Sequence, residues 1–138
     1  MIPIIIPAYE PDQRLIGLLK DLSEYNYGPV ILVNDGSGSA YQDLFQKAKE
    51  LISEKGVLLT HEVNRGKGRA LKTAFQYILE NLPEATGAVT ADSDGQHTNT
   101  AIVNVAEMML QNQGNLILGV YTAILAWMAG STGLSIHL

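Results

Sequence analysis

Residues 87–97 read Gly-Ala-Val-Thr-Ala-Asp-Ser-Asp-Gly-Gln-His, an apolar run followed by two carboxylates that one residue separates. The run is typical of a short buried strand, and the acidic pair lies where that strand should end. Two carboxylates this close disfavour each other's ionisation unless a cation lies between them. Asp92 and Asp94 therefore predict a site for Mg²⁺ or Mn²⁺, to which Gln96 could add an amide oxygen. The alternative is a polar turn whose aspartates only cap the following helix.

The composition describes one globular domain, since 46% of the 138 residues are hydrophobic and 17% are charged. The absence of cysteine excludes a disulfide scaffold and a cysteine-based zinc site, and it is compatible with a cytoplasmic location. All nine lysines and arginines lie at or before Lys72, together with nine of the fourteen acidic residues, so residues 73–138 carry the whole net charge of −5. This acidic balance argues against nucleic acid as a partner.

Short β-branched runs alternate with longer amphipathic stretches along the chain. The expected strands are residues 2–6, 30–33, 57–60, 87–91 and 116–120, and the expected helices are residues 12–24, 40–54, 68–81 and 98–113. This alternation predicts an α/β fold with a mostly parallel sheet and helices on both of its faces. Ligands of such sheets bind outside the carboxyl ends of the strands.

Four polar segments follow predicted strands and should meet at that edge of the sheet. They are Pro7-Ala8-Tyr9-Glu10, Asn34-Asp35-Gly36-Ser37, residues 64–70 (Asn-Arg-Gly-Lys-Gly-Arg-Ala) and Asp92-Ser93-Asp94. Tyr9 could stack on a nucleoside, and the Asp35 carboxylate could accept hydrogen bonds from the edge of a base. Glycine amides and basic side chains at a helix N-terminus favour a phosphate. His61, at the end of a predicted strand, is interpreted as structural.

Each of these segments alone also fits ordinary structure, such as a tight turn or a solvated basic loop. Two other enzyme classes share single motifs with the chain. A sugar nucleotidyltransferase would carry its glycine-rich loop after the first strand, not the third. A phosphatase of the haloacid-dehalogenase type would carry Asp-x-Asp-Gly at the start of the fold, with a lysine downstream, and no lysine follows Lys72. The convergence of four segments favours a different class.

In their order and spacing across residues 1–120, the four segments resemble the inverting, metal-dependent glycosyltransferases of family two. Within that family the chain looks most like the polyprenyl- and dolichyl-phosphate mannosyl- and glucosyltransferases. The resemblance implies a truncated nucleotide-diphospho-sugar transferase fold (GT-A, Rossmann-like). It also implies transfer of a sugar from a UDP- or GDP-sugar to a polyprenyl phosphate or a glycan, in the synthesis of cell-envelope glycans. The expected location is the cytoplasm, at the cytoplasmic face of the membrane.

The resemblance also implies roles for particular residues. The residues expected to bind the nucleotide-sugar are Pro7, Ala8, Tyr9, Glu10, Asp35, Lys67, Gly68, Asp92, Ser93 and Asp94. Of these, Asp35 would hold the base. Asp92, Asp94 and Gln96 would hold Mg²⁺ or Mn²⁺ on the diphosphate. No catalytic residue is assigned.

The chain departs from the family pattern after residue 120. No arginine follows Arg69 and no carboxylate follows Glu107, whereas the family uses such residues to hold or activate the acceptor. Residues 1–120 are therefore expected to form the nucleotide-sugar-binding domain, and residues 121–138 an uncharged, atypical tail through which copies could associate. A membrane span over residues 116–136 is a second interpretation of the tail. The competing functional hypothesis is a non-catalytic fragment that binds a nucleotide or self-associates.

Overall fold

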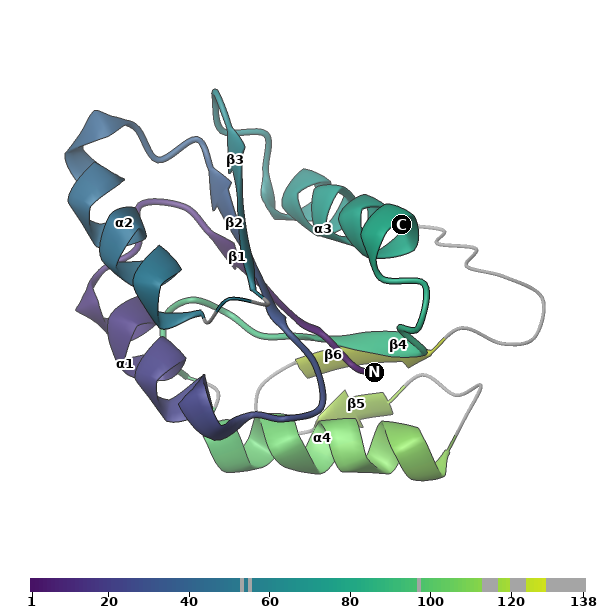
Figure 1. Cartoon of the computed structure of the whole chain (residues 1–138). Coiled ribbons are helices and arrows are strands. Elements are labelled where there is room, and N and C mark those ends of the chain that lie inside the picture. Colours follow the sequence, from purple (N-terminus) through teal and green to yellow (C-terminus); the bar gives the residue numbers. More distant parts are fainter. Residues whose placement is uncertain (53, 55, 97, 113–116, 120–123, 129–138) are drawn as a thin grey trace.

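The computed structural model describes residues 1–52, 54, 56–96, 98–112, 117–119 and 124–128. Six strands form a single sheet in the order β3-β2-β1-β4-β6-β5 (Figure 1). Their bounds are β1 Ile4–Ala8, β2 Val30–Asp35, β3 Val57–His61, β4 Gly87–Thr90, β5 Ile117–Gly119 and β6 Ile124–Met128.

The first four strands are parallel. β1 pairs with β2 on one side and with β4 on the other, and β2 pairs with β3. β6 is antiparallel to both β4 and β5, so of these six strands it alone runs against the others. The sheet is therefore mostly parallel, as predicted. The carboxyl ends of β1 to β4 point to the same edge, where the four polar segments begin.

The sequence does not predict β6, which lies within residues 121–138, the segment interpreted as a tail. In the structure β6 separates β5 from β4, and the pairing joins Gly87 to Met128. Residues 121–123 and 129–138 lie outside the described residues. The self-associating tail therefore stays a prediction, and so does the membrane span over residues 116–136. No helix in the described part of the chain is both long and apolar enough to cross a membrane.

All four predicted helices are present; three are shorter than predicted, and α3 begins one residue earlier. They are α1 Gln13–Asp21, α2 Gln42–Leu51, α3 Lys67–Asn81 and α4 Asn99–Gln111, and the 3₁₀ turns Leu22–Glu24 and Ser39–Tyr41 flank α1 and α2. Side chains cap two of the helices: Asp12 accepts a hydrogen bond from the Arg14 amide at 2.9 Å, and Thr98 accepts one from the Ala101 amide at 3.1 Å. Both caps satisfy amides that the first helical turn leaves unpaired.

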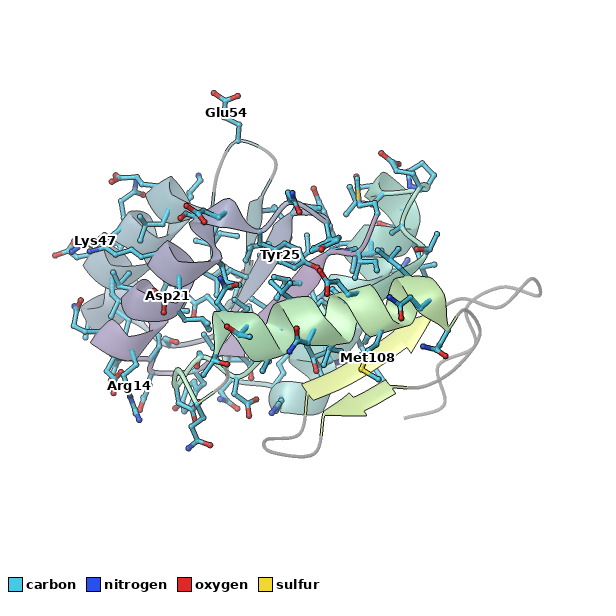
Figure 2. All side chains as sticks on the ribbon, turned by 90° about the horizontal axis from the view of Figure 1, so that it is seen from below. Arg14, Asp21, Tyr25, Lys47, Glu54 and Met108 are labelled. Carbon is cyan, nitrogen blue, oxygen red and sulfur yellow. The ribbon has the colours of Figure 1, made fainter. Side chains whose placement is uncertain are left out.

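The helices cover both faces of the sheet (Figure 1). Ile4 and Ile6 point from β1 into a core shared with α1, α2 and α4, whereas Ile5 points to the opposite face and packs under α3. This alternation explains why the strands are continuous apolar runs, since both faces of a parallel sheet are buried. Met108 lies on the outer face of α4, where 49% of the residue is exposed (Figure 2).

Candidate functional site

A pocket of about 340 Å³ lies at the carboxyl ends of β1, β2 and β4. Its lining residues are Pro7, Ala8, Tyr9, Asp35, Asn64, Gly66, Lys67, Asp92, Ser93 and Asp94. Eight of the ten residues expected to bind a nucleotide-sugar therefore surround one cavity, and each of the four polar segments contributes to it. A larger groove of about 580 Å³ runs along α3 beside Leu59, but none of the expected residues line it.

Two of the expected residues, Glu10 and Gly68, lie outside the pocket lining. Asn64 and Gly66 line the pocket although the sequence analysis did not select them. Both come from the glycine-rich segment before α3, so the segment was found but the residues facing the cavity were not. Which residues of a short loop face a cavity depends on its backbone path, as at Gly66, whose φ is +92°.

The loop after β1 is tied to the loop after β2. The Glu10 amide donates a hydrogen bond to Ser37 Oγ at 2.9 Å, and the Ser37 amide donates one to Asn34 Oδ1 at 3.0 Å. Glu10 has a positive φ of 46°, which is uncommon for a residue other than glycine. This turn leaves Tyr9 half exposed at the pocket, and the neighbouring Glu10 carboxylate raises the pKa of its phenol. An exposed aromatic ring on a fixed loop suits stacking.

A lysine faces the acidic pair across the pocket. Lys67 Nζ donates a hydrogen bond to Asp92 Oδ1, which joins the start of α3 to the end of β4. The Asp94 side chain instead has a local partner, because its Oδ1 accepts a hydrogen bond from the Gln96 amide at 3.1 Å. Gly95, which has a positive φ, forms the turn between Asp94 and Gln96. Gln96 is exposed and does not line the pocket, and His97 lies outside the described residues.

The donor set at this edge fits a magnesium or manganese ion that shares its ligands with a bound phosphate. Within the described residues, no group of three or more His, Cys, Asp or Glu side chains gathers as a metal centre. Mg²⁺ is often held by only one or two carboxylates together with phosphate oxygens and water. Asp92 and Asp94 both line the pocket and can supply those two carboxylates.

Asp35 is buried behind the pocket and holds the glycine-rich loop. Its Oδ1 accepts hydrogen bonds from the Arg65 amide at 2.9 Å and from His61 Nδ1 at 2.7 Å, and its Oδ2 accepts one from the Gly66 amide at 2.9 Å. A carboxylate offers about four acceptor positions, so these described contacts occupy most of them. Asp35 thus has a structural task that the sequence did not predict, and its hold on a base stays a prediction.

The electrostatics of Asp35 follow from these contacts. Burial acts to raise the pKa of the carboxyl, but the hydrogen bonds from His61, Arg65 and Gly66 outweigh it and lower the pKa below its usual value. The unfolded chain therefore takes up this proton at a higher pH than the folded chain does. The ionised Asp35 carboxylate therefore contributes its full stabilisation of the folded chain above the pKa of the unfolded chain, about 3.9. This contribution is lost as the pH falls through the lower pKa of the folded chain.

Asp35→Asn should lower the free energy of unfolding by about 2 kcal/mol at neutral pH, because the amide replaces one charged acceptor with a donor that faces backbone amides. Urea unfolding of both proteins at neutral pH and at about pH 3.5 measures this difference. The difference should shrink at the acid pH, where the Asp35 carboxyl of the unfolded wild-type chain is already largely protonated. Asp43→Asn, at an exposed position of α2, is the control and should change stability little. A difference that grew with acid would contradict the assigned pKa direction.

The fold matches that of a solved protein structure. The crystal structure of S. aureus TarS, residues 1–349, superposes with a TM-score of 0.64 over 99% of this chain and 38% of that chain. The two sequences are only 18% identical, so this likeness shows the fold alone. The predicted α/β class is confirmed.

The model of glycosyl transferase family 2 matches residues 4–126, and the chain therefore belongs to this family. The UDP-N-acetylglucosamine–dolichyl-phosphate N-acetylglucosaminyltransferase of Methanococcus voltae is 28% identical over 133 residues, which are 86% of this chain and 51% of that protein. An uncharacterised protein of Methanocaldococcus jannaschii is 28% identical over 117 residues, 84% of this chain and 44% of that protein. The chain thus spans about half the length of these relatives. The family resemblance seen in the sequence is confirmed.

Proposed function

We propose that the chain binds a nucleoside-diphosphate sugar in the pocket at the carboxyl ends of β1, β2 and β4, and that the sugar is transferred with inversion to an acceptor. The observation that carries this proposal is the meeting of four polar segments around one cavity. The chemistry of the cavity supports it, since backbone amides, a lysine and an aromatic ring suit a diphosphate attached to a nucleoside. Membership of the glycosyltransferase family agrees with the proposed reaction.

In this proposal different residues of the pocket bind different parts of the nucleotide-sugar. Pro7, Ala8 and Tyr9 face the nucleoside, and Tyr9 stacks on the base or the ribose. Asp35 keeps Gly66 and its loop in place, and its remaining acceptor position is available to a base edge. Lys67 faces the diphosphate, where its charge stabilises the negative charge that grows as the sugar leaves.

Asp92 and Asp94 are the residues that would hold Mg²⁺ or Mn²⁺. A bound ion would supply charge neutralisation for the leaving nucleoside diphosphate. Asp92 pairs with Lys67 and Asp94 lines the same pocket, so the lysine and a bound ion would both place positive charge beside Asp92. In the proposal Ser93 lies between the two aspartates and borders the diphosphate.

The proposed acceptor is a polyprenyl phosphate, and a glycan is the alternative. The Methanococcus voltae relative is named for transfer to dolichyl phosphate, which supports the first of these. The relatives are about twice the length of this chain, so acceptor binding and turnover are proposed for the whole family domain. The hypothesis of a non-catalytic nucleotide-binding fragment differs in predicting donor binding without transfer.

Isothermal titration of UDP, GDP and their sugars into the purified chain tests the proposal. Each nucleotide is titrated with Mn²⁺ and again with EDTA. We expect one nucleotide to bind with Mn²⁺ and to lose most of its affinity with EDTA, because the diphosphate then meets the Asp92 and Asp94 carboxylates with no divalent ion to offset the repulsion. Absence of binding to a folded chain would reject the donor site. Transfer to an added polyprenyl phosphate separates a complete enzyme from a fragment that only binds.

A further inference from the structure

We infer that His61 is a positioning residue of the pocket, which acts through Asp35 on the loop that carries Lys67. His61 ends β3 and lies opposite Asp35 in the register of β2 and β3. Its side chain is 9% exposed, and that of Asp35 is 4% exposed. The two groups therefore form a buried contact directly behind the pocket that Asp35 lines.

Both nitrogens of the His61 ring have partners in the structure. Nδ1 lies 2.7 Å from Asp35 Oδ1, and Nε2 lies 2.8 Å from Thr73 Oγ1 of α3. An ionised carboxylate can only accept, so Nδ1 carries a hydrogen and donates it to Asp35. With both nitrogens bound, the ring has one orientation, and it presents that hydrogen to one oxygen of Asp35.

The contact between His61 and Asp35 is linked to the pocket by the loop before α3. Asp35 uses the same two oxygens to hold the amides of Arg65 and Gly66. Gly66 is followed directly by Lys67, the first residue of α3 and the partner of Asp92. Residues 62–65 are exposed, and their backbone approaches Gly36, the residue after Asp35, at Val63 and Asn64. A rotation of the Asp35 carboxylate would therefore move the Arg65 and Gly66 amides, and with them Lys67.

Thr73 gives the chain of contacts a second fixed point. It lies on α3 six residues after Lys67, and its hydroxyl completes the series Asp35–His61–Thr73 that joins β2, β3 and α3. The start of α3 is thus held both at Gly66 and at Thr73. Replacing a buried polar network by apolar groups is often neutral or favourable for stability, so stability alone does not explain this network.

Three variants test the inference, which rests on the proposed function only in its nucleotide readout. His61→Phe removes both ring nitrogens, His61→Asn keeps one donor near the position of Nδ1, and Thr73→Val removes the hydroxyl. In His61→Phe we expect the Arg65 and Gly66 amides to exchange with solvent about tenfold faster and UDP or GDP with Mn²⁺ to bind about tenfold more weakly. His61→Asn should restore most of both effects, and Thr73→Val should show smaller changes in the same direction.

Nuclear magnetic resonance of the free chain gives the readout that needs no ligand. It follows amide exchange at Arg65 and Gly66, and it should show the wild-type His61 ring protonated at Nδ1. Unchanged exchange in a folded His61→Phe chain would overturn the inference, as would an Asn variant as impaired as the Phe variant. If His61→Phe does not fold, amide exchange at Arg65 and Gly66 in Thr73→Val decides: faster exchange than in the wild type supports the inference, and unchanged exchange overturns it. Should no nucleotide bind to the wild type, the proposed function fails while amide exchange still decides the role of His61.

Discussion

Asp94→Asn is expected to abolish metal-dependent nucleotide binding and to leave the fold unchanged. The substitution keeps the shape of the side chain and its acceptor for the Gln96 amide, but it removes one of the two charges at the end of β4. A divalent ion would then be held by Asp92 alone, which also pairs with Lys67. We expect nucleotide affinity in the presence of Mn²⁺ to fall about 100-fold or more.

The measurement is the titration used for the wild type, with Mn²⁺ and with EDTA. Asp21→Asn is the matched control, because Asp21 is an exposed aspartate at the C-terminal end of α1 and does not line the pocket (Figure 2). It changes the net charge by the same amount and should leave binding unaffected. Circular dichroism of both variants checks the fold. Wild-type affinity in Asp94→Asn would remove Asp94 from the metal site.

Gly36→Ala should destabilise the chain by about 4 kcal/mol. Gly36 follows Asp35 and has a φ of +71°, where a side chain is strained. A Cβ at this position would also overlap the Val63 carbonyl carbon and the Asn64 nitrogen, both of which are backbone atoms. The loop before α3 would have to move away, and the amides of Arg65 and Gly66 would leave Asp35.

Gly17→Ala makes the same chemical change in a different setting. Gly17 is exposed in the middle of α1, and a Cβ there meets nothing within 4 Å. We expect this variant to be more stable than the wild type by about 0.5–1 kcal/mol, since alanine is the better helix former. Urea unfolding of the two variants beside the wild type should give changes of opposite sign. A mild effect of Gly36→Ala would show that the close approach of the two loops can relax.

The sequence predicted the parallel part of the fold well because each of its elements carries a local signal. The strands are apolar runs, the helices have one apolar stripe, and Asp12 and Thr98 are good caps. The pairing of β6 with β4 has no such signal, because residues 87–90 and 124–128 lie far apart in the chain. A short apolar run fits a buried strand in either direction.

The candidate site was predicted at the level of segments and less well at the level of roles. The strand order brings the ends of β1, β2 and β4 together, so a correct α/β prediction was enough to collect Pro7, Asp35 and Asp92. The hydrogen bonds of Asp35 could not be foreseen. They depend on which way the His61 side chain points and on the backbone conformation at Gly66, and a sequence motif specifies neither.

The contact between Lys67 and Asp92 makes the two ligands of the proposed site interdependent. In the chain without ligand these side chains neutralise each other. A cation that takes Asp92 sets the lysine free for an anion, and an anion that takes the lysine sets Asp92 free for a cation. Each ligand should therefore raise the affinity for the other by the same factor, as thermodynamic linkage requires. We expect either ligand alone to bind weakly, so that the site selects the metal–nucleotide complex.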